Sequence, residues 1–104
     1  MTEENLMMLG LKRPAAKLLI YMLENPGPKT QDDIVLSGTI KQPYISVASK
    51  ELREWGFLIT EEIPKRRSAY IKRYSLIPVE KIRAIFIQKI MQEHNKKMVA
   101  VSSF

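Results

Sequence analysis

The 104-residue chain contains no cysteine, one histidine and four glycines. Without cysteine it can form neither a disulfide framework nor a thiolate zinc site, and a reducing cytoplasm is the expected location. The acidic residues Asp32-Asp33 and Glu61-Glu62 are adjacent pairs that need not meet at one site, and there is no Gly-rich phosphate loop. An enzyme is therefore not expected, and neither a metal site nor a cofactor is predicted.

Long apolar runs are also absent. No stretch approaches the ~20 residues that a membrane helix needs, so no membrane association is predicted. The N-terminal segment MTEENLMMLG is acidic, whereas a secretion signal would be basic. The length suits a single domain with one modest core.

Positive charge is present and unevenly distributed. The net charge is +6, yet residues 1–40 carry four basic and five acidic side chains. Residues 63–79 carry five basic side chains and no acidic one. A local basic segment of this kind indicates a polyanionic partner more strongly than the net charge does.

Capping and turn residues predict a series of helices. Thr2 starts a short helix that stops at Gly10, and a second helix runs from Pro14 to Asn25-Pro26. Thr30 and Asp33 resemble a capping box for a third helix over residues 31–37, closed by Gly38 at positive φ. The next helix opens at Gln42-Pro43 and ends at Gly56. Two helices joined by a few residues around a glycine have the helix-turn-helix form.

After Gly56 the pattern changes to that of strands. FLITEEI and AYIKRYSLI are rich in β-branched and aromatic residues and flank the basic connector PKRRS, which predicts a β-hairpin with Lys65, Arg66 and Arg67 at its tip. A long helix follows. The expected organisation is one domain over residues 1–78 with its N-terminal helical segment, a separate long helix over 79–98 and a tail over 99–104.

The helix from Gln42 to Trp55 has two different faces. At 100° per residue Ile45, Ala48, Leu52 and Trp55 share one face, which we assign to the core. Opposite lies a narrow ridge that includes Ser46, Val47 and Lys50. Such a ridge fits the major groove of DNA, where serine and lysine contact base edges or phosphates and valine contacts a thymine methyl group. A solvated face with an incidental exposed valine is the alternative.

The flanking residues extend this candidate surface. We expect the ring of Tyr44 to pack near Trp55 and its hydroxyl to reach a phosphate. Thr39 and Gln42 can either cap the helix or contact DNA, and capping is favoured for Gln42. The residues assigned to the recognition element are Thr39, Gln42, Tyr44, Ser46, Val47 and Lys50.

The helix charges cancel, because Lys50 and Arg53 are matched by Glu51 and Glu54. Attraction to phosphates is therefore expected from the hairpin tip. Three tip contacts per subunit of a dimer predict a slope of about −5 for log affinity against log salt. Alternatively, the charged tip prevents edge-to-edge strand pairing.

The C-terminal helix is apolar over roughly 240° of its circumference, more than a monomeric core requires. This predicts a homodimer, whose two recognition helices would read a pseudo-palindrome with half-sites about 34 Å apart. Burial against a different protein, or beneath the N-terminal segment of the same chain, are the alternatives. The assigned dimer residues are Ile82, Ile85, Phe86, Ile87, Ile90 and Met91.

The order of these parts resembles the winged helix-turn-helix transcription regulators, in particular the small prokaryotic MarR-like, ArsR-like and TrmB-like groups. The resemblance covers residues 9–76 and includes LREWGFLI, which matches the phrase that closes the family's recognition helix. It implies a mainly α fold with a β-hairpin wing (α+β), and it places Ser46, Val47 and Lys50 on the DNA side. The chain departs from the family pattern at Pro43-Tyr44 and at Glu54.

The resemblance also implies a function. It implies a homodimeric, cytoplasmic transcription regulator that binds specific double-stranded DNA. Metal sensing of the ArsR-like kind uses cysteines or clustered histidines, which this chain with its single His94 lacks, and any effector would have to bind at the dimer interface. The alternative is a winged helix that binds proteins, or an architectural nucleic-acid-binding module without sequence specificity.

Overall fold

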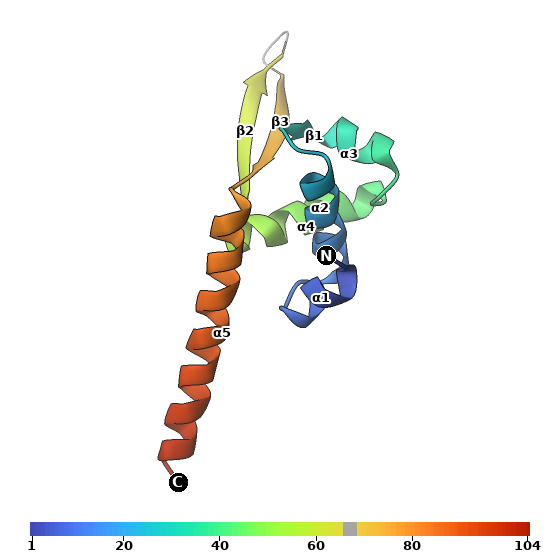
Figure 1. The fold of residues 1–104 in the computed structure, drawn as a ribbon. Coiled ribbons are helices and arrows are strands. Elements are labelled where there is room, and N and C mark those ends of the chain that lie inside the picture. Colours follow the sequence, from blue (N-terminus) through green and yellow to red (C-terminus); the bar gives the residue numbers. More distant parts are fainter. Residues whose placement is uncertain (66–68) are drawn as a thin grey trace.

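The computed structural model describes residues 1–65 and 69–104. Within these residues it has the expected α+β winged-helix-like fold, with five helices and a small antiparallel sheet, and the C-terminal helix projects away from the rest (Figure 1). In chain order the elements are α1 (Glu3–Met8), α2 (Arg13–Glu24), β1 (Lys29–Thr30), α3 (Gln31–Ser37), α4 (Gln42–Trp55), β2 (Leu58–Pro64), β3 (Tyr70–Leu76) and α5 (Val79–Ser102).

Local signals set most helix boundaries as predicted. The Thr2 hydroxyl accepts a hydrogen bond from the Asn5 N–H and caps α1. At α3 both halves of the capping box form, since the Thr30 N–H donates to the Asp33 carboxylate at 2.9 Å and the Asp33 N–H donates to the Thr30 hydroxyl at 3.2 Å. The bond from the Thr30 N–H foremost, and next the Thr30 hydroxyl beside the carboxyl, hold the pKa of Asp33 below its ordinary value. Gly38 ends α3 with φ 70° and Gly56 ends α4 with φ 85°.

The sheet has the order β1-β3-β2, and β1 is an element that sequence analysis missed. It consists of two residues, and Lys29 and Thr30 pair with Tyr74 and Arg73 of the central strand β3. A two-residue strand contains no alternation from which to detect it. The pairing of β1 with β3 attaches the start of α3 to the hairpin. The hairpin and the helix-turn-helix are therefore connected through backbone hydrogen bonds of the sheet.

The helix α5 is longer than expected. It continues to Ser102 over 24 residues, about 36 Å at ~1.5 Å per residue. No glycine or proline stops it after Met98, so residues 99–102, the first four of the six taken as a tail, are helical. Figure 1 shows α5 projecting away from the other helices in the direction opposite to the hairpin, which makes the molecule 62 Å long and 27 × 25 Å across.

The core lies between α2, α4 and the base of the hairpin. Its largest fully buried side chain is Phe57, which stacks on Trp55 at a centroid distance of 5.4 Å and contacts Phe86 of α5 at 4.9 Å. Leu6 of α1 and Leu18 and Leu19 of α2 complete it from the other side. The three rings therefore connect the end of α4, the start of the hairpin and the first half of α5.

Candidate nucleic-acid interface

The two faces of α4 have the predicted environments. Ile45, Ala48 and Leu52 are buried, and Ser49 beside them is buried with its hydroxyl donating to the Ser46 carbonyl at 3.1 Å. Ser46, Val47 and Lys50 are exposed on the outer side, Val47 with 53% of its surface accessible. Because the apolar face is used inside the molecule, these three side chains are open to a partner.

The residues at the start of α4 differ in part from expectation. Thr39 lies in the turn, where its N–H donates to the Ser37 hydroxyl. The N-cap of α4 is Lys41, and no side chain caps this end, so the capping role favoured for Gln42 is wrong. Gln42 is the first helical residue and is exposed.

Tyr44 does not lie near Trp55. The two residues occupy the first and last turns of α4, about 16 Å apart along a helix that rises ~1.5 Å per residue. Tyr44 instead lines a hollow between the helix-turn-helix turn and the start of α2, together with Lys17 and Lys41. Sequence analysis missed these two lysines, because they come from different segments and only folding brings them together.

The hairpin register explains where positive charge remains on the wing. Arg73 lies opposite Glu61 and pairs with it at 2.6 Å, and Lys72 lies opposite Glu62. Two of the five basic side chains between residues 63 and 79 thus face carboxylates that β2 supplies. Of the other basic side chains in this segment, Lys65 is described: it is exposed just beyond β2, and its N–H donates to the Ala69 carbonyl at 2.7 Å.

Arg66 and Arg67, also assigned to DNA contact, lie outside the described residues. Their assignment stays a prediction from the sequence.

The residues assigned to a dimer interface divide into two sets. Ile82 and Phe86, with 5% and 7% of their surface accessible, pack into the chain's own core, and Ile85 is half-buried against it. Ile87, Ile90 and Met91 are exposed. The interface prediction made from sequence alone therefore included two residues whose apolar surface is already covered within one chain.

Further apolar side chains continue along the exposed part of α5. They are Met98, Val99 and Val101. Nearer the core, Ile87 and Ile90 also line an apolar hollow of about 270 Å³, whose lining also contains Leu9, Leu19 and Leu23. The N-terminal segment thus borders the exposed side of α5 but leaves Ile87 and Ile90 about half accessible.

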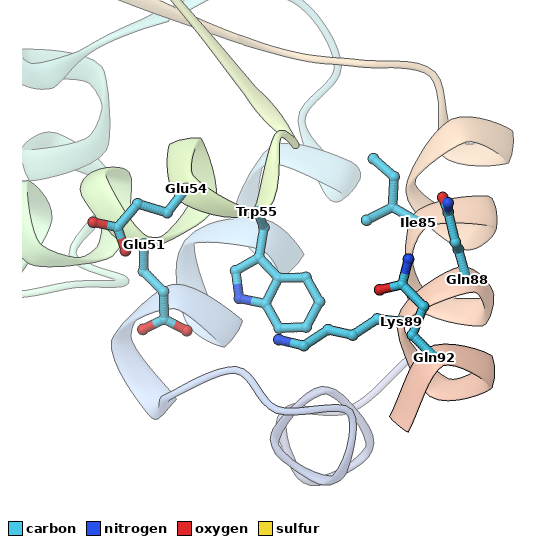
Figure 2. Close-up of a pocket in the computed structure, with 7 residues that line it drawn as sticks. All are labelled: Glu51, Glu54, Trp55, Ile85, Gln88, Lys89 and Gln92. Atoms are coloured by element: carbon cyan, nitrogen blue, oxygen red, sulfur yellow. The ribbon is translucent and has the colours of Figure 1, made fainter. Parts of the chain in front are cut away.

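A contact at the end of α4 fixes the direction in which α5 leaves the domain. The Lys89 ammonium of α5 lies 3.7 Å from the centre of a Trp55 ring (Figure 2). The Phe86 ring packs on the same side chain at a centroid distance of 5.1 Å. Glu51 connects α4 to a second neighbour, since its carboxylate accepts a hydrogen bond from the Lys12 N–H at 3.0 Å. The recognition helix candidate is therefore held both by the segment that leads into α2 and by α5.

Residues 1–65 and 69–104 contain neither a metal cluster nor a membrane helix. Within these ranges no three histidine, cysteine or acidic side chains come close enough together to hold a metal ion. In the same ranges no helix is both long enough and apolar enough to cross a membrane.

Comparison with known proteins gives a likeness of fold. The chain matches no protein-family model and no curated protein sequence. A solved structure described as a possible transcriptional regulator from Methanosarcina mazei Go1 superimposes with a TM-score of 0.77 at 20% sequence identity, over 91% of this chain and 79% of that one. At this identity the likeness concerns the fold, and it covers nearly the whole chain. This chain therefore has the α+β winged-helix-like fold that it shares with that protein.

Proposed function

We propose that the chain is a regulator of transcription that binds specific double-stranded DNA as a homodimer. In this proposal α4 enters the major groove and the hairpin tip contacts phosphates or the minor groove. The fold is shared with a protein described as a possible transcriptional regulator, which favours this class of function.

The observation that carries the proposal is the exposed ridge of α4. Ser46, Val47 and Lys50 face solvent from a helix whose other face is buried in the core, so their side chains are free for a partner. Ser46 offers a hydroxyl, Val47 a methyl surface for thymine and Lys50 a donor to guanine or phosphate. A helix about 12 Å across fits a groove of similar width, and two of the three side chains on this ridge are short.

The dimeric state rests on α5. A helix that projects from its domain with Ile87, Ile90 and Met91 exposed has apolar surface that a second copy would cover. A two-fold axis would present two copies of α4 to one duplex and favour a pseudo-palindromic site.

Selection of bound duplexes from a random oligonucleotide pool tests the proposal. We expect an enriched pseudo-palindrome with half-sites about 34 Å apart. The variant Ser46→Ala/Lys50→Ala should lose discrimination at one or two positions of each half-site, worth about 1–3 kcal/mol per base contact. The matched control Lys97→Ala/Ser102→Ala changes the same residue types near the far end of α5 and should select the same site. An unchanged preference in the α4 variant would remove α4 from base recognition.

A second candidate function is a winged helix that binds another protein. It is favoured by apolar side chains that are exposed on the helix-turn-helix, namely Leu36 with 84% of its surface accessible, Val47 and Tyr44. Salt-dependent DNA binding without an enriched sequence would indicate an architectural module, whereas no duplex binding at all would leave the protein-binding function.

A further inference from the structure

We propose that the hollow between the helix-turn-helix turn and the start of α2 binds a backbone phosphate of the duplex, with Lys17 and Lys41 as its two cations. The inference rests on the proposed function and adds a contact to it. It assigns a phosphodiester site to residues that lie outside both the ridge of α4 and the wing.

The hollow has the shape and charge that such a ligand requires. It measures about 360 Å³ and opens to solvent, and its lining contains three basic side chains and no carboxylate. The basic side chains are Arg13, Lys17 and Lys41. They come from the first turns of α2 and from the residue before α4, so a ligand in the hollow contacts both helices.

The three cations are not equivalent. Arg13 already pairs with Glu3 at 3.2 Å, which compensates its charge. The ion pairs formed among the described residues are Arg13–Glu3 and Arg73–Glu61, and neither involves Lys17 or Lys41. Lys17 is half-buried, and the lining of the hollow contains no carboxylate to compensate its charge. An anion in the hollow would supply that compensation.

Other groups around the hollow favour a phosphodiester over a free phosphate ion. Tyr44 and Thr39 contribute hydroxyl groups that can donate to phosphate oxygens. Pro14 and Ile40 supply apolar surface, which suits a deoxyribose next to the phosphate. The start of α4, which borders the hollow, has no side-chain cap, so its partial positive charge adds to that of the lysines.

The position of the hollow agrees with the proposed docking. Thr39 and Tyr44 line it, and both belong to the turn and first helical turn that would approach the groove. A phosphate bound there would lie at the edge of the groove that α4 enters. Contacts of this kind set the register of a protein on DNA and carry no sequence information themselves.

The test is the variant Lys17→Gln/Lys41→Gln, with Lys96→Gln/Lys97→Gln as control. Both variants lower the net charge by two, and the control lysines lie exposed near the C-terminal end of α5. Each phosphate contact contributes about 0.9 to the slope of log affinity against log salt. Taking 1 M salt as the reference, loss of one contact therefore lowers the affinity at 0.1 M salt about eightfold, and loss of one contact in each of two subunits lowers it about sixtyfold. We expect this loss for selected and scrambled duplexes alike, a slope smaller by about 1.8, and almost no change in the control.

Phosphate ethylation interference makes the test more specific. With the unaltered chain, ethylation of one phosphate at the edge of each half-site should block binding, and with Lys17→Gln/Lys41→Gln the same modification should no longer matter. If the two lysine variants bind alike, the hollow is not a phosphate site and the proposed function stands. If the unaltered chain binds no duplex, the proposed function and this inference both fail.

A final arm distinguishes the source of the phosphate. Inorganic phosphate is titrated at constant ionic strength while the amide resonances of residues 38–42 and 44 are followed. We expect no saturable shift below about 10 mM, since a lone ion gains nothing from Pro14 and Ile40 and competes poorly with water. Saturable binding of inorganic phosphate in that range would reassign the hollow to a small anion.

Discussion

Removing apolar side chains from α5 should show which of them support self-association and which of them stabilise the fold of one chain. Ile87 and Ile90 have 51% and 49% of their surface accessible, whereas Ile82 on the same helix is buried. The variant Ile87→Ala/Ile90→Ala should therefore weaken self-association and leave the fold of one chain nearly intact. The variant Ile82→Ala should instead destabilise the fold.

The size of the first effect follows from burial. An isoleucine-to-alanine change removes three carbons, each worth about 0.8 kcal/mol when transferred from water to an apolar interface. Half of each side chain is still accessible, so each substitution removes about 1.2 kcal/mol of association free energy. Four such side chains in a symmetric dimer give about 5 kcal/mol, which raises the dissociation constant by between three and four powers of ten.

Sedimentation equilibrium over a dilution series measures this constant, and denaturant unfolding measures the fold. We expect Ile87→Ala/Ile90→Ala to be monomeric at micromolar concentrations at which the unaltered chain is dimeric. Ile82→Ala should cost about 2–5 kcal/mol of unfolding free energy, because it leaves a cavity in the core that Phe57 and Phe86 share. If the unaltered chain is monomeric at all concentrations, or if the double variant dimerises with the same constant, the reasoning about α5 is refuted.

Three further outcomes are expected. Arg66→Ala/Arg67→Ala should reduce duplex affinity and lower the salt slope by about 0.9 for each phosphate that the tip no longer neutralises, measured by fluorescence anisotropy, while the selected sequence stays the same. Gly56→Ala places a side chain at φ 85° and should cost about 1 kcal/mol or more of unfolding free energy, or roughly 5 °C in Tm by calorimetry. Gly56→Asn should cost less, because asparagine tolerates this conformation. Equal losses in the two variants would show that packing, and not backbone strain, is the cause. The lowered pKa of Asp33 stabilises the fold fully above its ordinary value of 3.8, and this stabilisation disappears as pH falls through the lower folded value. The difference in unfolding free energy between the unaltered chain and Asp33→Asn should therefore shrink in denaturant titrations below that pH, and a difference that does not depend on pH would exclude ionisation of Asp33 as its cause.

Charge on the wing shows where counting along the chain falls short. Residues 63–79 contain no acidic side chain, yet Arg73 is paired with Glu61, twelve positions away. The register of β2 on β3 decides which charges meet, and it is set by the whole hairpin. The two strands of the hairpin could be predicted from sequence, but the pairing of Arg73 with Glu61 could not.

The amino-acid sequence by itself determined the order and type of the main elements. Thr30 with Asp33, Gly38 and Gly56 act within a few residues of their own positions, so the start of α3, the turn and the end of α4 could be predicted locally. The ridge of α4 followed in the same way, because the helical period alone separates it from the core face.

Only the tertiary structure decided which residues far apart in the chain share a surface. It brought Lys17 of α2 beside Lys41 of the turn, and it used Ile82 and Phe86 of α5 inside the core while leaving Ile87 and Ile90 exposed. A capping or periodicity signal depends on the conformation of one short segment. A shared hollow or a covered face depends on how separate segments pack, and no single segment contains that information.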